Sequence, residues 1–475
     1  MNRNLRQVKR LEGTVEIPVS YKTALRIVIP ALFAEGVTTI NPFPKCSAAE
    51  DLIRFIQNTF EGSLERTGST VSIKGYGSFT AGELPSEIDV GSDSEILMHL
   101  LPLYLRRGGR FTCGKSVATP RFDSFIKQID KMGFYVEKEE TEEKLIVKVT
   151  PASPDSVHIV LAEADEALKT ALLYSMLNVS GNSRIIEPTP LPEDSETILR
   201  KFKAPITSFR KGEAAAEDDD NAVENSAEDN ELMRRIRKLQ AKKEASSGEK
   251  PSRTIQIAET VRLKAAEFNL SGDPACAAPF LLAGLLVNHS EITVKSIEGS
   301  ATSGIFAALR RMGALFNSER VKDRNAFDCL STPVKLVSRK ISGELTSDCG
   351  ELLPFVAVAA AYAEGQTVIR NADFLRKGDR DIIAITLQNL KKMGTKVGEI
   401  EDGFVIEGAR EHDGAEFDTG GAATVGMAFA VAALKNKGES VIKGAEAVDA
   451  LFPDFFHRLD SLVKEDKPVS SETIV

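Results

Sequence analysis

The residues best placed to bind a charged group stand at the start of the first apolar helix. A Pro-Val-Ser loop at 18–20 precedes this helix, with Ser20 in position to cap it and Lys22 and Arg26 one turn apart. The first turn of a helix presents unpaired N–H groups and the positive end of the helix dipole, so cations there can help to hold an anion. The favoured interpretation is that both cations lie on a solvated face, and the alternative is an anion site.

Other residues that could bind a metal or take part in catalysis lack the spacing that this chemistry requires. No HxxxH or HExxH pair is formed by His99, His158, His289, His412 or His457, so we expect surface or core histidines and no metal site. Glycine-rich loops of the P-loop or dinucleotide type are absent, so we expect no cofactor. Cys276 stands at a helix start, where a small buried thiol is the favoured interpretation over a nucleophile.

A unit that recurs along the chain carries these residues. Its clearest copy, Thr419 to Leu462, runs from a glycine turn into a small apolar helix, a stop at Gly438, a β-branched strand and an amphipathic helix. Six copies follow one another roughly every 70 to 77 residues, with one longer interval. The apolar helices are expected at 24–32, 96–105, 167–177, 280–287, 355–363 and 427–434. They have no polar face, which predicts burial of Phe429, Val431, Phe355, Val358, Leu281 and Leu173.

Length and composition narrow the class of protein. With 475 residues, of which 42% are hydrophobic, the chain can form two or more domains with ample cores. A net charge of -9 gives no basic footprint for nucleic acid, and no apolar run reaches membrane-spanning length. The five cysteines show no CxxC pairing and the first residues lack a signal peptide, so we expect a cytoplasmic monomer with reduced thiols.

The longer interval coincides with a charged segment at 212–252. Its first half is acidic, the stretch from Met233 to Lys243 is strongly basic, and few apolar residues are available to bury. This composition predicts a disordered insertion. A solvated tether is the simpler interpretation, and the alternative is that the insertion binds a partner, either a protein or nucleic acid.

Several strings of residues resemble one known family, the EPSP synthases, or 3-phosphoshikimate 1-carboxyvinyltransferases, within the enolpyruvyl transferases. The stretch 272–281 looks like its GDxSSAAFFL motif, 354–365 like PxxAVAAAFAEG, 427–434 like MAFAVAAL and 452–456 like the end of SFPDFF. The resemblance covers the whole chain except the insertion. It implies an α/β fold of two domains, each of three βαβαββ-type repeat units with buried helices, closing on ligand at a cleft. By this analogy one domain holds 1–18 plus 270–475 and the other holds 19–269.

Several functional positions of that family are replaced in this chain. The family's PGSKS loop aligns with 18–22, which puts Tyr21 at the position of a lysine for phosphoenolpyruvate. Two further cationic positions read Thr424 and Ala450. The resemblance implies Glu351 as the catalytic carboxylate, and the candidate substrate-binding residues are Ser20, Lys22, Arg26, Arg121, Arg376 and Arg380. Of these, Arg376 and Arg380 follow from an alignment with a two-residue gap.

Carboxylates crowd the helix starts that surround the expected cleft, at Asp93, Glu95, Asp165, Glu166, Asp273, Asp348 and Glu351. Most are explained as helix caps, but several facing one cleft would repel a phosphate dianion. The first hypothesis is therefore an EPSP-synthase-like protein that has lost enolpyruvyl transfer and binds a small anionic or less charged ligand, or acts as a scaffold. The alternative is an active 3-phosphoshikimate 1-carboxyvinyltransferase of the shikimate pathway, in which the candidate residues take over the ionic roles.

Overall fold

The computed structural model describes residues 1–161, 165–191, 193–210, 252–259, 262–299, 301–302, 304–322, 324–376, 380–408 and 411–464. The charged insertion expected at 212–252 lies outside the described residues, apart from its last position. Asp379, which the gapped alignment places beside Arg380, also lies outside them.

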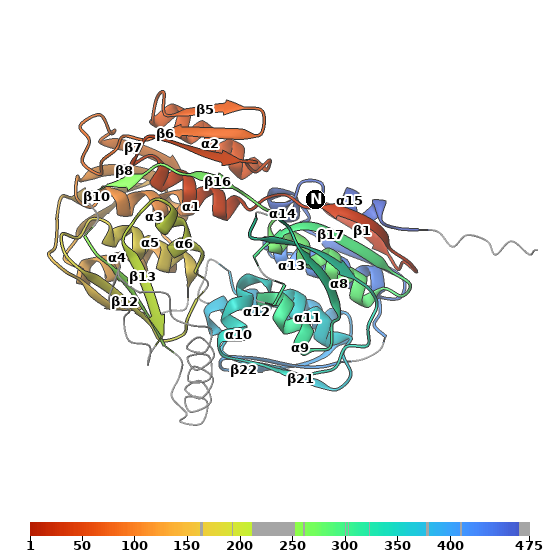
Figure 1. The fold of residues 1–475 in the computed structure, drawn as a ribbon. Helices are drawn as coiled ribbons and strands as arrows, with labels where there is room; N and C mark the ends of the chain where they lie inside the picture. Colours follow the sequence, from red (N-terminus) through yellow and green to blue (C-terminus); the bar gives the residue numbers. More distant parts are fainter. Residues whose placement is uncertain are drawn as a thin grey trace, which may run out of the picture.

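One sheet topology is repeated six times among the described residues (Figure 1). In each sheet the first two strands pair in parallel and the next pairs antiparallel, and five of the six sheets add a fourth, antiparallel strand. This pattern is the βαβαββ-type unit that the family resemblance implies. Because parallel neighbours need a crossover connection, a helix lies between the paired strands in most units.

The units of the first half contain the following elements. The first has α1 (Tyr21–Ala31), β4 (Val37–Asn41), α2 (Ser47–Thr59), β5 (Leu64–Thr67) and β6 (Thr70–Lys74), with β16 (Glu267–Asn269) completing its sheet. The second has β7 (Glu87–Gly91), α3 (Ser94–Leu100), η1 (Leu101–Tyr104), β8 (Gly109–Gly114), η2 (Lys115–Val117), α4 (Pro120–Lys131), β9 (Tyr135–Glu140) and β10 (Lys144–Thr150). The third has β11 (His158–Val160), α5 (Glu166–Met176), β12 (Ser183–Glu187), α6 (Asp194–Lys201), β13 (Ile206–Arg210) and β14 (Arg253–Ile257). A separate short pair joins β3 (Ala34–Glu35) and β15 (Leu263–Lys264).

The units of the second half follow the same plan. The fourth has β2 (Glu12–Glu16), α8 (Pro274–Leu286), β17 (Glu291–Glu298), α9 (Gly304–Arg311), β18 (Phe316–Arg320) and β19 (Ala326–Ser331). The fifth has β20 (Lys340–Ile341), α10 (Glu344–Cys349), η3 (Gly350–Leu352), α11 (Leu353–Ala361), β21 (Gln366–Ile369), η4 (Asp373–Arg376), α12 (Ile382–Lys392), β22 (Lys396–Ile400) and β23 (Gly403–Glu407). The sixth has β24 (Glu416–Asp418), α13 (Ala423–Lys435), β25 (Glu439–Lys443), α14 (Glu446–Leu451) and α15 (Phe455–Ser461), with β1 (Asn2–Arg6) completing its sheet.

Two separate hydrophobic cores form, each around three of the apolar helices. One is built from residues of 24–270 and the other from Leu5, Leu11, Val15 and residues of 276–462. The six side chains predicted to be buried are all 0% exposed, so this prediction is confirmed. We keep 19–269 and 1–18 plus 270–475 as proposed domain boundaries, since each core draws on one of these ranges, with Leu270 at the crossover as the exception.

Residues with positive φ follow several of the apolar helices, as the glycine stops predict. Gly365 after α11 and Gly438 after α13 have φ of +100° and +82°, a backbone conformation that costs glycine little. After α8 the same place is taken by His289, whose φ is 55°. The chain can therefore turn from each buried helix into the next strand within a few residues.

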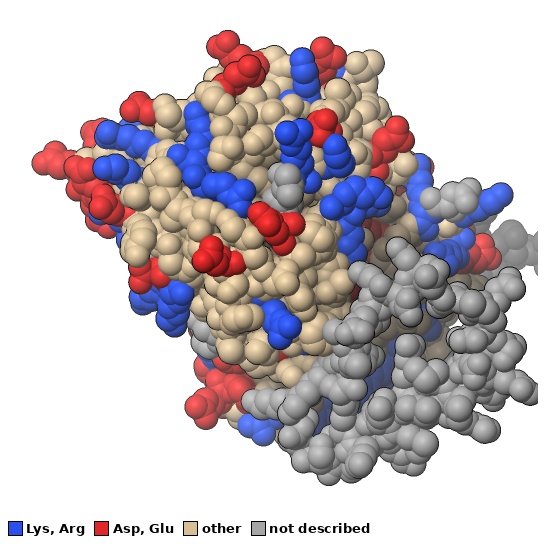
Figure 2. All heavy atoms as spheres, turned by 60° about the vertical axis from the view of Figure 1, so that its left-hand side comes forward, with Lys and Arg blue, Asp and Glu red and all other residues tan. Residues whose placement is uncertain are grey.

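The outer surface of the first half mixes both signs of charge. Figure 2 shows Lys and Arg interspersed with Asp and Glu over this face. Among the described residues, no helix is long and apolar enough to cross a membrane.

Candidate functional site

A cavity of about 800 Å³ lies where the starts of the central helices of both halves meet. Its wall includes residues from the first turns of α1, α3, α5, α8 and α13, together with η3. The sequence candidates that line this cavity are Ser20, Lys22, Arg26, Arg121, Glu351 and Arg380.

Lys22 and Glu351 form an ion pair across the cavity between the two halves. Ser20 caps α1 by accepting a hydrogen bond from the Thr23 N–H, which leaves the Lys22 side chain free to reach η3. Lys22 Nζ lies 2.7 Å from Glu351 Oε2, and the side chains are 46% and 51% exposed. The charge of each partner acts on the other, so the pKa of Lys22 is raised and that of Glu351 is lowered.

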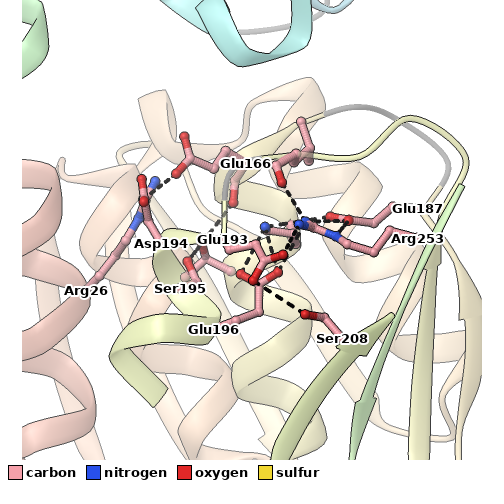
Figure 3. Close-up of polar contacts among 12 residues, drawn as sticks. Arg26, Glu166, Glu187, Glu193, Asp194, Ser195, Glu196, Ser208 and Arg253 are labelled. Atoms are coloured by element: carbon pink, nitrogen blue, oxygen red, sulfur yellow. Dashed lines mark hydrogen bonds and ion pairs between the residues drawn. The ribbon is translucent and has the colours of Figure 1, made fainter. Parts of the chain in front are cut away.

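Arg26 is the most deeply buried cation of the cavity wall, with 6% of its surface exposed. Its Nη1 donates to Glu166 at the start of α5 and lies 4.0 Å from Asp194 Oδ2 at the start of α6 (Figure 3). Burial is the largest single effect and would raise the pKa of Glu166. The charge and hydrogen bond of Arg26, together with the charges of Lys169 and Lys22, outweigh burial and lower this pKa. Glu166 is therefore ionised, and Arg26 is already neutralised by carboxylates of the same cavity.

Arg121 is also paired with a carboxylate of the cavity. Its Nε donates to Asp165 Oδ2 at 2.7 Å, and the two side chains are 18% and 16% exposed. Asp165 also caps α5, because its Oδ1 accepts from the Leu168 N–H at 2.9 Å. Asp165 therefore both pairs with Arg121 and caps α5.

The two arginines of the gapped alignment lie in different surroundings. Arg380 lines the cavity beside the turn at Gly421, where an added Cβ would lie 3.0 Å from Arg380 Nε. Arg376 is not among the described residues of the cavity wall. Its guanidinium pairs with Asp381 at 3.1 Å and with Glu399 at 2.7 Å. The structure therefore brings five of the six candidate substrate-binding residues to the cavity together with Glu351.

Carboxylates outnumber cations in the wall of the cavity. Six of the seven acidic residues singled out at helix starts line it, all except Asp93. Sequence reasoning missed three more: Glu193 and Asp194, next to the start of α6, and Glu298 at the end of β17. The described part of the wall thus holds nine carboxylates against four cations, Lys22, Arg26, Arg121 and Arg380.

Glu298 shows the effect of this crowding. Burial is the largest cause that raises its pKa to about 8, and the charges of Asp194 and Asp273 raise it further. His99, which sequence reasoning placed on the surface or in the core, also lines the cavity and is 3% exposed. Neither has a motif around it, and Asp194 comes next to Glu298 only through the fold.

A buried charge network fixes the acidic loop that borders the cavity. Arg253, the first residue of β14, donates to Glu187 Oε2 at 2.6 Å, to Glu193 Oε1 at 2.9 Å and to the Leu191 carbonyl at 2.5 Å (Figure 3). Lys169 on α5 joins the network at 3.0 Å from Glu196 Oε2. The positions of Glu193 and Asp194 are therefore set by contacts behind the cavity.

Comparison with known proteins decides the family. The model of the family EPSP synthase (3-phosphoshikimate 1-carboxyvinyltransferase) matches residues 5–217 and 213–459. The chain belongs to the EPSP synthase family. Relatives of this family include the 3-phosphoshikimate 1-carboxyvinyltransferases of Brevibacillus brevis, 25% identical over 97% of this chain and 99% of its own length, and of Synechococcus, 25% identical over 97% and 96%.

Solved structures of EPSP synthase family proteins and their relatives share the fold. EPSP synthase from Acinetobacter baumannii superposes with a TM-score of 0.75 at 20% identity, over 97% of this chain and 98% of that one. The enolpyruvyl transferase NikO from Streptomyces tendae gives a TM-score of 0.67 at 15% identity, over 97% and 96%. The predicted α/β fold, with two domains of three repeat units, is confirmed by these likenesses.

Proposed function

We propose that this member of the EPSP synthase family does not transfer an enolpyruvyl group to shikimate 3-phosphate, and that its cleft binds a less anionic ligand. One observation carries the proposal: nine carboxylates face four cations in the described wall of the cavity. Phosphoenolpyruvate and shikimate 3-phosphate together bring two phosphates and two carboxylates. Glu298, with its pKa raised to about 8, is mostly protonated near pH 7, which leaves eight carboxylates against four cations. A cavity with this excess of negative charge repels such a pair.

Three of the four cations of the described wall are occupied, and Arg380 is the exception. Lys22 is paired with Glu351, Arg26 with Glu166, and Arg121 with Asp165. A phosphate that binds one of these cations must displace a carboxylate, and that carboxylate stays in the same cavity. The net gain from each contact is therefore smaller than for a cation without a carboxylate partner.

The replaced positions weaken phosphate binding further. Tyr21, Thr424 and Ala450 line the cavity where the family resemblance implies cations. Each lost charge-assisted hydrogen bond weakens binding by roughly 1.5 to 3 kcal/mol, so three losses amount to several powers of ten even when they are not additive.

The alternative function is enolpyruvyl transfer by displaced residues. Two observations favour it. One cavity is lined by Lys22, Arg26, Arg121, Arg380 and Glu351. Relatives that match nearly the whole chain carry the name 3-phosphoshikimate 1-carboxyvinyltransferase. In this case Glu351 would act as the catalytic carboxylate, and substrate would release it from Lys22.

A phosphate-release assay separates the two functions. Purified protein is incubated with phosphoenolpyruvate and shikimate 3-phosphate, with EPSP synthase from Acinetobacter baumannii as the positive control. We expect no release above the rate without protein. Release at about 1 per second or faster, abolished by Glu351→Ala or Arg26→Ala, would replace the proposal with the alternative.

A further inference from the structure

Three polar groups on α1 and α3 belong to residues of the cavity wall and lack a partner among the described residues. The Nε2 of His99 and the hydroxyl of Tyr21 are buried and have no hydrogen-bond partner among the described residues. The carboxylate of Glu95 also has no ion pair or side-chain hydrogen bond among the described residues. All three residues line the cavity.

The protonation of His99 shows what its free nitrogen needs. His99 Nδ1 lies 2.7 Å from the Glu95 carbonyl oxygen, and since a carbonyl only accepts, Nδ1 carries the hydrogen. Burial lowers the pKa of His99 to about 4, so the ring is neutral near pH 7. Nε2 is therefore an acceptor. Because His99 is only 3% exposed, this acceptor requires a hydrogen-bond donor.

Glu95 adds a negative charge to the same spot. Glu95 and His99 are four residues apart on α3, so their side chains share one face of the helix. The pKa of Tyr21 is raised by burial and then by the charges of Asp93 and Glu95, which shows that this negative field reaches α1. The wall thus offers a carboxylate and an imidazole nitrogen from α3 and a phenol oxygen from α1.

We propose that this wall binds the ammonium group of an organic primary amine. Glu95 supplies the opposite charge, His99 Nε2 accepts one N–H, and the Tyr21 oxygen accepts another. This inference rests on the proposed function and deepens it, because a cleft that repels phosphates is free to take a cation.

Three other ligand classes fit these groups less well. No group of three or more His, Cys, Asp and Glu side chains among the described residues has the arrangement of a metal site, which disfavours a divalent cation. An anion would face the carboxylate of Glu95 and the lone pair of His99. A quaternary ammonium ion has no N–H to give to Nε2.

The test compares three small probes of equal chain length and different charge. The probes are 1,4-diaminobutane, 1,4-butanediol and succinate, titrated into the full chain near pH 7 while the ¹⁵N chemical shift of His99 Nε2 is followed. We expect the diamine alone to shift this signal in a saturable way. Equal shifts with the diol would mean that any hydroxyl or solvent satisfies Nε2, and no shift with the diamine would overturn the proposal outright.

A pair of matched variants tests the charge. Glu95→Gln keeps the shape and the backbone carbonyl but removes the charge, and we expect it to weaken diamine binding about tenfold or more. Glu87→Gln makes the same change on an exposed position of β7 outside the cavity wall, and diamine binding should stay unchanged. Equal affinity of the Glu95→Gln variant and the wild type would refute the inference. Tyr21→Phe, expected to weaken binding less, provides a second test if Glu95→Gln does not fold.

These results separate this inference from the proposed function. The amine titrations contain neither phosphoenolpyruvate nor shikimate 3-phosphate, so phosphate release would end the proposed function without altering them. Flat amine titrations in a protein that also releases no phosphate would end this inference alone.

Discussion

Among single side chains, Lys169 is the one whose removal we expect to lower the free energy of unfolding most. It is completely buried on α5, with Nζ 3.0 Å from Glu196 Oε2 and 3.6 Å from Glu187 Oε1, and both carboxylates are also 0% exposed. Lys169→Met keeps a chain of similar length but leaves two buried carboxylates to Arg253 alone. Removing one partner of a buried ion pair typically costs about 3 to 5 kcal/mol, and we expect a loss of that size in the free energy of unfolding near pH 7.

The loss should depend on pH in a defined direction. Burial already raises the pKa of Glu187 in the wild type, and without Lys169 its pKa rises further. A carboxyl with a raised pKa in the folded state binds a proton that the unfolded chain releases, so its cost falls as the pH falls. The difference between variant and wild type should therefore be smaller at pH 5 than at pH 7.

Urea unfolding followed by circular dichroism measures this difference. The control is Lys127→Met, which removes a cation from an exposed position of α4 and should change the free energy of unfolding by less than about 0.5 kcal/mol. A loss below about 1 kcal/mol for Lys169→Met, or one that grows toward pH 5, would refute the reasoning.

Three further predictions concern buried groups. Because the pKa of Glu298 is raised to about 8, this group makes the protein lose stability as the pH rises from the pKa of Glu298 in the unfolded chain toward 8. Glu298→Gln should remove this dependence of stability on pH in thermal unfolding curves. An unchanged dependence would count against the crowding of carboxylates. His99, whose pKa is lowered to about 4, should stay neutral in an NMR titration down to about pH 5 and should destabilise the fold below its ordinary pKa, whereas titration near 6.5 would show a solvated ring. All five cysteines are buried, and burial raises the pKa of the Cys276 thiol, so a thiol reagent should react only as the protein unfolds; rapid reaction of Cys276 in the folded protein would favour a nucleophile.

The central helices could be predicted from sequence because burial leaves a mark along the chain itself. Phe355 and Phe429 stand in helices with no polar face, and such helices have no other stable place than a core. The helix starts were marked as well, by Ser20 before α1 and by Asp165 before α5, both of which cap their helices as their residue types favour.

The pairing inside the cavity could not be predicted in the same way. Arg26 and Glu166 are 140 residues apart, and Lys22 and Glu351 are 329 apart, so only the closing of the repeat units brings them together. Sequence identified both cations as candidates for an anionic ligand, whereas the fold pairs each with a carboxylate. Glu298 carried no signal, since its raised pKa depends first on burial by the fold and then on the charges of Asp194 and Asp273 from other elements.

The measurement that tests the central claim most directly is a calorimetric titration of shikimate 3-phosphate into the wild-type protein. The excess of carboxylates in the cavity and the replaced cations predict no measurable heat of binding at millimolar ligand. The Tyr21→Lys, Ala450→Lys double variant restores two cations at the cavity wall and should gain affinity. Saturable binding of shikimate 3-phosphate to the wild type at micromolar ligand, lost in Arg26→Ala, would contradict the account.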